Sequence, residues 1–217
     1  MGDAEPSRLI LASGSASRRR LLEAAGAAFD VRPADVDERA IARAIADGPA
    51  YEEPLGLAQA VARTLARAKA LDVSARRSAD LVIGADQTLA LLIEDGAGRV
   101  GRSLDKPDDI AAARRQLVQM RGKTHVLCSA VALARGGEVV WEVEDRAELT
   151  MRHFSDAFLD DYLVRAGESV CSSVGAYQLE GLGLQLFERI KGDYFTILGL
   201  PLLPLMGELR RVGILDA

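Results

Sequence analysis

The chain has few of the residues that build disulfide or metal frameworks. Its 217 residues include two cysteines and two histidines, and aromatic side chains make up 5% of the chain. Cys128 and Cys171 lie far apart, and neither has a second cysteine nearby, so we expect buried reduced thiols rather than a disulfide or a zinc site. His125 and His153 have no ligand-like partner at short spacing, which favours packing or surface roles for both.

Long apolar runs and long basic runs are absent too. The longest apolar stretch, residues 197–206, contains two prolines and a glycine and is too short to span a membrane. Residues 1–6 are acidic and polar, unlike a secretory signal. The formal net charge is -5, so nucleic acid is not expected as a partner. Together with the reduced thiols, these features predict a cytoplasmic protein with no membrane partner.

The composition that is present fits a folded globular protein. Hydrophobic residues make up 49% of the chain and charged residues 27%, enough for one large domain or two small lobes. Short strand patterns alternate with helical patterns, but residues 124–134 and 138–150 form a long hairpin around Gly136-Gly137. We therefore predict one domain over residues 1–217, of the α/β class, with a mixed central sheet flanked by helices.

An arginine cluster marks the first candidate site. Residues 9–12 are typical of a buried strand, residues 13–17 of a turn, and Arg18-Arg19-Arg20 start a helix that Gly26 closes. Because a helix N-terminus already carries partial positive charge, three guanidinium groups there are unfavourable unless an anion binds. This favours a phosphorylated ligand where the first strand meets the first helix. An exposed, arginine-rich helix start is the equally open alternative.

The rest of the chain yields a coarse order of elements. A second strand at 29–33 runs into an acidic loop at 35–38, and a Gly/Pro-rich stretch at 47–56 follows. A long helix then begins near Leu57, with Lys69 at the edge of its apolar stripe. The later expected elements are a strand at 81–89, a reverse turn at 94–98, helices from Pro107 to Gly122 and from 155 to 165, a strand at 185–190 and a last helix from Pro201.

Asp86 is the strongest single candidate for chemistry. Aspartate is depleted in strands, yet Asp86 follows an apolar run, and ligands in open α/β sheets collect beyond the carboxyl ends of strands. A carboxylate there could bind Mg²⁺ or orient a water molecule, whereas the plainer alternative is an aspartate that caps a local turn. Glu38 alone would be a solvated charge, but beside Asp86 it could complete a divalent cation site.

Three further residues are weaker candidates. Lys69 and Lys106 are surface lysines by default, although Lys106 precedes a proline on a rigid loop just before a helix. Glu180 lies beside glycines that would allow close backbone approach to a ligand, or simply a tight turn.

Several motifs together resemble the Maf family of nucleoside triphosphate pyrophosphatases, almost end to end. Any one of them is a weak signal, but their order and spacing are highly specific. The matching stretches are LILASGSASRRRLLEAAG (9–26), VDE (36–38), LARAKA (65–70), IGADQT (83–88), KP (106–107), RGKTHVLCSAVAL (121–133) and GAYQLEGLGLQLFERIKGDYFTILGLPL (175–202).

The resemblance implies a Maf/ITPase-like fold of two lobes around a cleft. It also implies hydrolysis of a modified or non-standard nucleoside triphosphate to the monophosphate and pyrophosphate, with Mg²⁺ or Mn²⁺. A homodimer is compatible with it, since family members often form one. Carried over by motif, Asp86 is the catalytic proton acceptor and a metal ligand with Glu38; Ser13, Arg18, Arg19, Lys69 and Lys106 bind the triphosphate; and Ser17, Gln87 and Glu180 determine specificity.

The specificity positions leave the preferred base open. Gln87 and Glu180 resemble the 7-methyl-GTP branch of the family, whereas the dTTP/UTP branch has Thr and Gln there. Ser17 matches neither branch. Ala16 stands where the family usually has proline, and Asp105 where it usually has the glycine before the lysine.

Two other functions remain open at this stage. A non-hydrolysing nucleotide-binding regulator of cell division would bind a triphosphate without turnover. A sugar-phosphate phosphatase would release orthophosphate rather than pyrophosphate.

Overall fold

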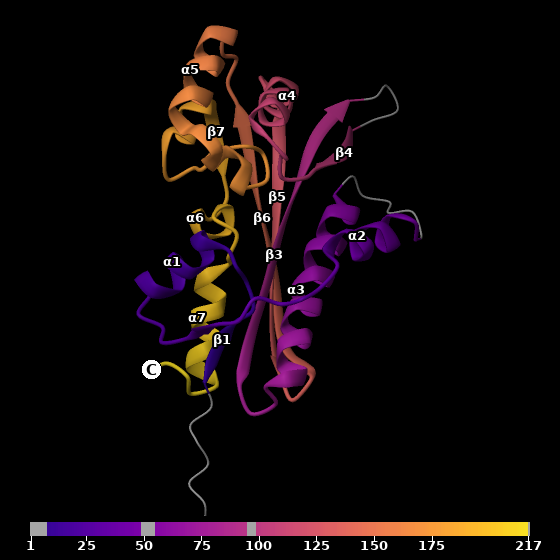
Figure 1. Ribbon diagram of the computed structural model, residues 1–217, viewed down its shortest axis with the longest axis vertical. Coiled ribbons are helices and arrows are strands. Elements are labelled where there is room, and N and C mark those ends of the chain that lie inside the picture. Colours follow the sequence, from indigo (N-terminus) through magenta and orange to yellow (C-terminus); the bar gives the residue numbers. More distant parts are fainter. Residues whose placement is uncertain (1–7, 49–54, 95–98, 217) are drawn as a thin grey trace, which may run out of the picture.

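The computed structural model describes residues 8–48, 55–94 and 99–216, which form a long twisted sheet with helices packed along it (Figure 1). The elements are β1 (Leu9–Leu11), α1 (Ala16–Ala24), β2 (Asp30–Val31), α2 (Glu38–Ala46), α3 (Gly56–Arg76), β3 (Leu81–Glu94), β4 (Arg99–Leu104), α4 (Ile110–Met120), β5 (Thr124–Arg135), β6 (Glu138–Met151), α5 (Asp156–Ala166), the 3₁₀ helices η1 (Gly167–Ser172) and η2 (Leu182–Leu186), β7 (Phe187–Lys191), α6 (Tyr194–Ile197) and α7 (Leu202–Arg211).

The sheet is mixed, which confirms the predicted α/β class. Within the described residues it has seven strands in the order β2-β1-β3-β5-β6-β7, with β4 paired to β3 outside this path. β2, β1 and β3 run parallel, whereas β3, β5, β6 and β7 are antiparallel neighbours. The predicted hairpin is the β5–β6 pair, and Gly136 and Gly137 both adopt positive φ at its turn, a conformation that glycine adopts without strain.

One edge of β3 changes partner partway along the strand. β1 pairs with β3 at residues 81–83, and β4 pairs with it from Leu89 onward. Among the described residues, 84–88 have no strand partner on that edge, although β5 pairs with them on the other. Asp86 lies in this break. Asp86 is inside β3, as the predicted strand at 81–89 implied, and β3 continues beyond that predicted end to Glu94. The strand that ends here is β1, whose Leu11 pairs with Ile83.

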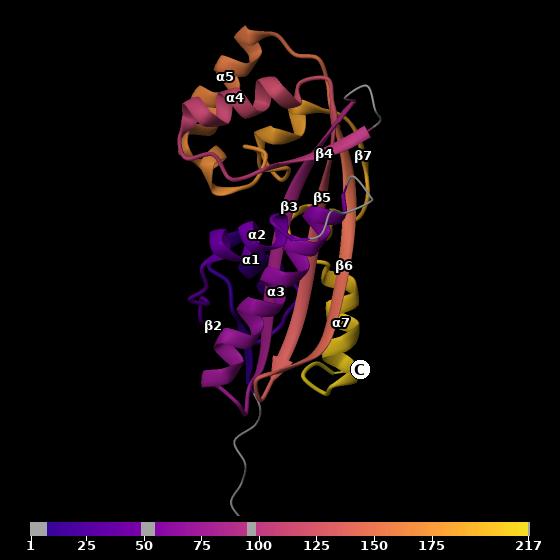
Figure 2. The ribbon, with the colours of Figure 1, turned by 90° about the vertical axis from the view of Figure 1, so that its right-hand side faces the viewer.

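The helices divide into two groups along the sheet (Figures 1 and 2). α3 covers one face of β3 and β5 through an alanine-rich interface, and residues of α1 and α7 share a core with the other face. At the other end of the sheet, α4, α5, η1 and η2 enclose a separate core rich in leucine, methionine and aromatic residues. The helices packed on β3 and β5 form one of the two predicted lobes, and the separate core at the other end of the sheet forms the second.

Two helix starts differ from the sequence prediction. The acidic segment expected as a loop begins α2 instead, because the Asp37 side chain accepts a hydrogen bond from the Ala40 amide and caps the helix. α1 starts at Ala16 rather than at the arginines, with Ser15 as its N-cap. Parts of two predicted segments lie outside the described residues: residues 49–54 of the Gly/Pro-rich stretch and residues 95–98 of the reverse turn. No helix in the part of the chain described is long and apolar enough to cross a membrane.

Candidate active site

A buried lysine joins the two acidic candidates. The Lys69 ammonium nitrogen lies 2.6 Å from Asp86 Oδ1 and 2.8 Å from Glu38 Oε1. The Lys69 and Asp86 side chains are each 9% exposed, whereas the Glu38 side chain is 53% exposed. The structure thus brings together three residues from α3, β3 and the start of α2; the sequence indicated a pairing of Glu38 with Asp86 but treated Lys69 separately.

A glycine lets α3 come close enough to β3 for this contact. A Cβ atom on Gly84 would lie 2.1 Å from the Ala66 carbonyl oxygen and 2.5 Å from the Ala70 nitrogen, so any side chain there would push the helix away. Lys69 lies on the stretch of α3 that crosses Gly84, and Asp86 is two residues further along the strand on the same face. The short Lys69–Asp86 distance therefore depends on Gly84.

Burial controls the protonation chemistry of Asp86. Removal from water raises the pKa of the Asp86 carboxyl group above its ordinary value, because desolvation outweighs the attraction of Lys69 and Arg18. A carboxylate with a raised pKa is a better proton acceptor than an ordinary surface aspartate. Lys69 contacts Oδ1 only, so the described contacts leave Asp86 Oδ2 available to accept a proton.

Arg18 lies in the break along β3. Its side chain is buried, and Nη1 donates to the Ala85 carbonyl oxygen at 2.8 Å and to Ser13 Oγ at 3.1 Å. Nε donates to the Gly199 carbonyl oxygen at 2.9 Å, which ties α1 to the loop after α6. The guanidinium group supplies the hydrogen bond that a neighbouring strand would otherwise give to Ala85. Burial lowers the pKa of Arg18, and Asp86 and Glu38 oppose this shift, so the acids stabilise its charge.

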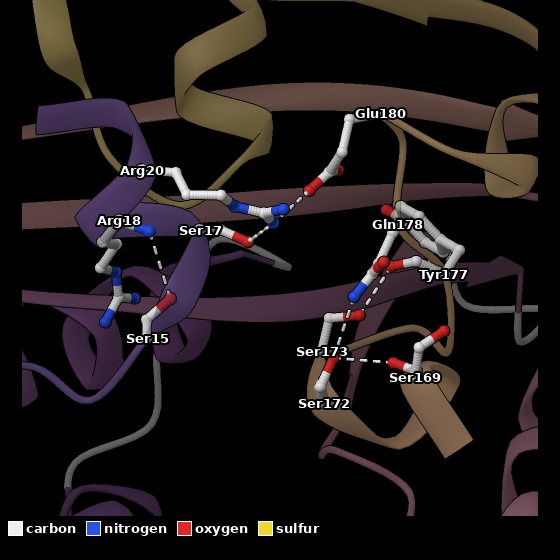
Figure 3. Close-up of polar contacts among 10 residues, drawn as sticks. All are labelled: Ser15, Ser17, Arg18, Arg20, Ser169, Ser172, Ser173, Tyr177, Gln178 and Glu180. Carbon is white, nitrogen blue, oxygen red and sulfur yellow. Dashed lines mark hydrogen bonds and ion pairs between the residues drawn. The ribbon is translucent and has the colours of Figure 1, made fainter. Parts of the chain in front are cut away.

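The three consecutive arginines do not converge as a single phosphate cradle. Arg18 turns inward, while the exposed Arg19 lies 3.6 Å from Glu23 on the same helix. Arg20 reaches Glu180, with its Nη2 3.2 Å from Glu180 Oε1 and 3.5 Å from Ser17 Oγ (Figure 3). Arg20 belonged to the predicted arginine cluster, but no role of its own was assigned to it, although its spacing of three residues from Ser17 places both on one helix face.

Gln87 points away from Asp86, as alternate residues of a strand must. Its amide nitrogen Nε2 donates to Ser129 Oγ at 2.9 Å and lies within 3.1 Å of the carbonyl oxygens of Thr196 and Ile197. Gln87 thereby fixes α6 against the sheet, just before the Gly199 carbonyl that Arg18 contacts. Ser129 and Thr196 were not predicted, since their roles depend on this contact between distant segments.

Lys106 has no described contact with the other predicted site residues. It is exposed on the segment between β4 and α4, next to the buried Pro107. No contact between Lys106 and the Lys69–Asp86 pair is recorded among the described residues.

The donor set suits a divalent cation shared with a phosphate ligand. The described residues contain no cluster of three or more His, Cys, Asp or Glu side chains that could hold a metal by themselves. Asp86 and Glu38 supply two carboxylates near one point, since both contact the same ammonium nitrogen. Mg²⁺ commonly uses one or two carboxylates plus substrate phosphates, so these residues fit a metal that binds together with its substrate.

The fold and the acid–lysine–arginine cluster define a mixed-sheet α/β protein with a buried polar site beside a broken sheet edge. The family model described as Maf-like protein matches residues 8–212. The chain belongs to this family, as its motif order predicted.

Several relatives match nearly the full length of the chain. A 7-methyl-GTP pyrophosphatase of Rhizobium etli is 51% identical over 96% of this chain and 98% of its own, and one of Brucella suis is 49% identical over the same shares. A nucleoside triphosphate pyrophosphatase of Paramagnetospirillum magneticum is 52% identical over 94% of this chain and 98% of its own.

Proposed function

We propose that the protein hydrolyses a modified or non-standard nucleoside triphosphate, such as 7-methyl-GTP, to the monophosphate and pyrophosphate. The observation that carries this proposal is the buried Lys69–Asp86 pair with Glu38 and Arg18 around it. The pyrophosphatase names of its near-full-length relatives support the same reaction class. The activity belongs with the hydrolases that act on acid anhydrides.

Asp86 is the proton acceptor in the proposed mechanism. A water molecule beside Oδ2 attacks the α-phosphorus and gives its proton to the Asp86 carboxylate. The bond from the α-phosphorus to the oxygen that bridges to the β-phosphorus breaks, and that oxygen leaves with pyrophosphate. Burial raises the pKa of Asp86, which favours this proton transfer.

Lys69 and Arg18 hold the positive charge around the reacting group. The Lys69 ammonium fixes Asp86 through Oδ1, and the buried Arg18 stays charged beside it. Fixed cations near the phosphates stabilise the negative charge that grows on the leaving pyrophosphate without reorganising during the reaction. Ser13, which accepts from Arg18, and the exposed Lys106 and Arg19 are proposed contacts for the triphosphate.

Asp86 and Glu38 would hold a divalent cation, Mg²⁺ or Mn²⁺, when the substrate is bound. Such a cation neutralises phosphate oxygens and lowers the pKa of bound water. Ser17, Gln87 and Glu180 are proposed to set the preference for the base. We further propose that the protein acts in the cytoplasm as a house-cleaning enzyme of the nucleotide pool, independently of nucleic acid and membranes, with a homodimer as its expected assembly.

The test is product analysis with a nucleotide panel. The protein is incubated with 7-methyl-GTP, GTP, dTTP and UTP plus Mg²⁺ or Mn²⁺, and pyrophosphate and orthophosphate are measured separately. The proposal expects pyrophosphate and a monophosphate, with turnover at least about 10³-fold lower in Asp86→Asn, which should keep the wild-type circular dichroism spectrum. Orthophosphate as the first product, or full turnover by Asp86→Asn, would contradict it.

A further inference from the structure

The side chain of Arg20 on α1 contacts the loop before η2. Arg20 Nη2 lies 3.2 Å from Glu180 Oε1, and the Arg20 side chain is 59% exposed. The same nitrogen lies 3.5 Å from Ser17 Oγ, so Arg20 connects two positions proposed to read the base (Figure 3). An exposed ion pair of this kind contributes little to folding. Its geometry calls for another explanation.

The backbone of the Glu180 loop is held by other contacts. Ser173 Oγ donates to the Tyr177 carbonyl oxygen at 2.6 Å, and Gln178 Nε2 donates to Ser172 Oγ at 3.2 Å (Figure 3). A Cβ atom on Gly183 would lie 2.5 Å from the Gln178 carbonyl oxygen, so η2 packs directly against the loop. Because these contacts do not involve Arg20, its loss should leave the loop in place and release only the Glu180 carboxylate.

We propose that Arg20 is a positioning residue that determines base specificity through Glu180. This inference rests on the proposed function. Arg20 engages Oε1 of Glu180, and the described contacts leave Oε2 as a hydrogen-bond acceptor whose direction is fixed. A fixed carboxylate oxygen selects a base edge that presents adjacent N–H groups, as the N1–H and exocyclic amine of a guanine-type base do.

The same arrangement disfavours uracil-type bases. Their single ring N–H lies between two carbonyl oxygens, which would approach the carboxylate and repel it. If Glu180 rotates freely, the carboxylate can turn away from these carbonyl groups and this penalty falls. Arg20 therefore acts on discrimination between bases rather than on the chemical step at Asp86.

The experiment compares Arg20→Gln, Arg20→Lys, Glu180→Gln and the double variant with wild type. Each is assayed with 7-methyl-GTP, GTP, UTP and dTTP for kcat and KM, and dissociation constants for the same nucleotides are measured by equilibrium dialysis with EDTA present. Arg165→Gln is the matched control, because Arg165 forms a similar exposed ion pair with Asp161 on α5.

We expect Arg20→Gln to lower the guanine-to-uracil ratio of kcat/KM about tenfold, through KM with kcat unchanged. Arg20→Lys should restore part of the ratio, Arg165→Gln should match wild type, and the double variant should lose no more than Glu180→Gln alone. An equal loss for all four nucleotides, an unchanged ratio, or additive effects in the double variant would overturn the proposal.

The binding data separate this proposal from the proposed function. If wild type binds the nucleotides but releases no pyrophosphate, the catalytic proposal fails, and the ratio of dissociation constants in Arg20→Gln still decides the role of Arg20. If wild type binds none of the four in EDTA and releases no pyrophosphate from any of them with metal present, both proposals fail.

Discussion

Two buried polar groups lie in the two halves of the molecule, and they differ in charge. At the broken edge of β3, Lys69, Asp86 and Arg18 place formal charges away from water. In the core between β5 and the loop before η2, His125 Nε2 and the Tyr177 hydroxyl form a 2.7 Å hydrogen bond. Burial lowers the pKa of His125 to about 3 and raises that of Tyr177, so this second pair is neutral.

This difference indicates that the neutral His125–Tyr177 pair serves the fold, whereas the charged group at β3 is suited to binding a ligand. Burial of a neutral hydrogen-bonded pair costs far less hydration free energy than burial of formal charges, and the Phe187 ring centroid lies 5.8 Å from that of His125 and 4.8 Å from that of Tyr177. Buried charges lose far more hydration, and apolar replacements are often as stable or more stable. The charged group at β3 is therefore better explained by chemistry than by stability.

The largest expected effect comes from removing the lysine of the charged group. Lys69→Met leaves the Asp86 carboxylate buried without its nearest cation, and we expect the free energy of unfolding to fall by about 3 kcal/mol. The double variant Lys69→Met with Asp86→Asn should recover most of this loss, because no uncompensated charge remains. Urea denaturation measures both changes.

Arg63→Gln serves as the control, since its pair with Glu144 is solvent-exposed and should contribute less than about 1 kcal/mol. If Lys69→Met proves as stable as this control, the Lys69–Asp86 pair is not a tightly coupled buried pair, and the contrast between the two regions fails.

A smaller effect is expected from the neutral pair, and it depends on pH. The pKa of His125 is about 3 in the folded protein and about 6.5 in an unfolded chain, so only the unfolded state binds the extra proton between these values. Stability should therefore fall with decreasing pH, by about 1.4 kcal/mol per pH unit once the pH is well below 6.5.

His125→Gln should remove this contribution of about 1.4 kcal/mol per pH unit from the pH dependence of stability, while the Gln side chain can still form a hydrogen bond with the Tyr177 hydroxyl. The measurement is urea denaturation between pH 7 and 5, and the difference between wild type and variant should reach about 2 kcal/mol at pH 5. Identical slopes in the two proteins would mean that His125 is not kept neutral by burial.

The two regions were unequally visible in the sequence. Asp86 stood out because an aspartate inside a strand violates a local pattern, whereas Lys69 was interpreted as a surface lysine by default, despite its place at the edge of an apolar stripe. The β5–β6 hairpin was predicted from Gly136-Gly137, and it sets the sheet order that follows. Such signals lie within a few residues of each other, so single-sequence reasoning can find them.

Long-range contacts explain what the sequence did not reveal. The inward turn of Arg18 depends on Gly199, which is 181 residues away, and the approach of Lys69 depends on Gly84 allowing α3 close to β3. The α2 helix was missed because an acidic segment is typical of a loop, yet Asp37 serves there as a cap. The contact of Arg20 with Glu180 was missed because the two residues are 160 positions apart in the chain.

The last prediction concerns the cysteines, which report on the two regions separately. Cys128 is 2% exposed on the sheet face under α3, and burial raises its pKa to about 11; Cys171 is half-buried in η1. With a thiol reagent at pH 8, wild type should label slowly at Cys171 and hardly at all at Cys128. Lys69→Met should speed Cys128 labelling by about 100-fold, because about 3 kcal/mol of lost stability raises the unfolded population by that factor.

Cys171 labelling should stay within about twofold in Lys69→Met if it proceeds from the native state, where the thiol already reaches solvent. Cys171→Ser identifies which signal belongs to Cys128, and labelled peptides are quantified by mass spectrometry. Rapid labelling of Cys128 in wild type would show that α3 separates from the sheet without global unfolding. In that case the charged group would lie in a locally mobile region, and the comparison with the rigid His125–Tyr177 core would rest on dynamics rather than on charge.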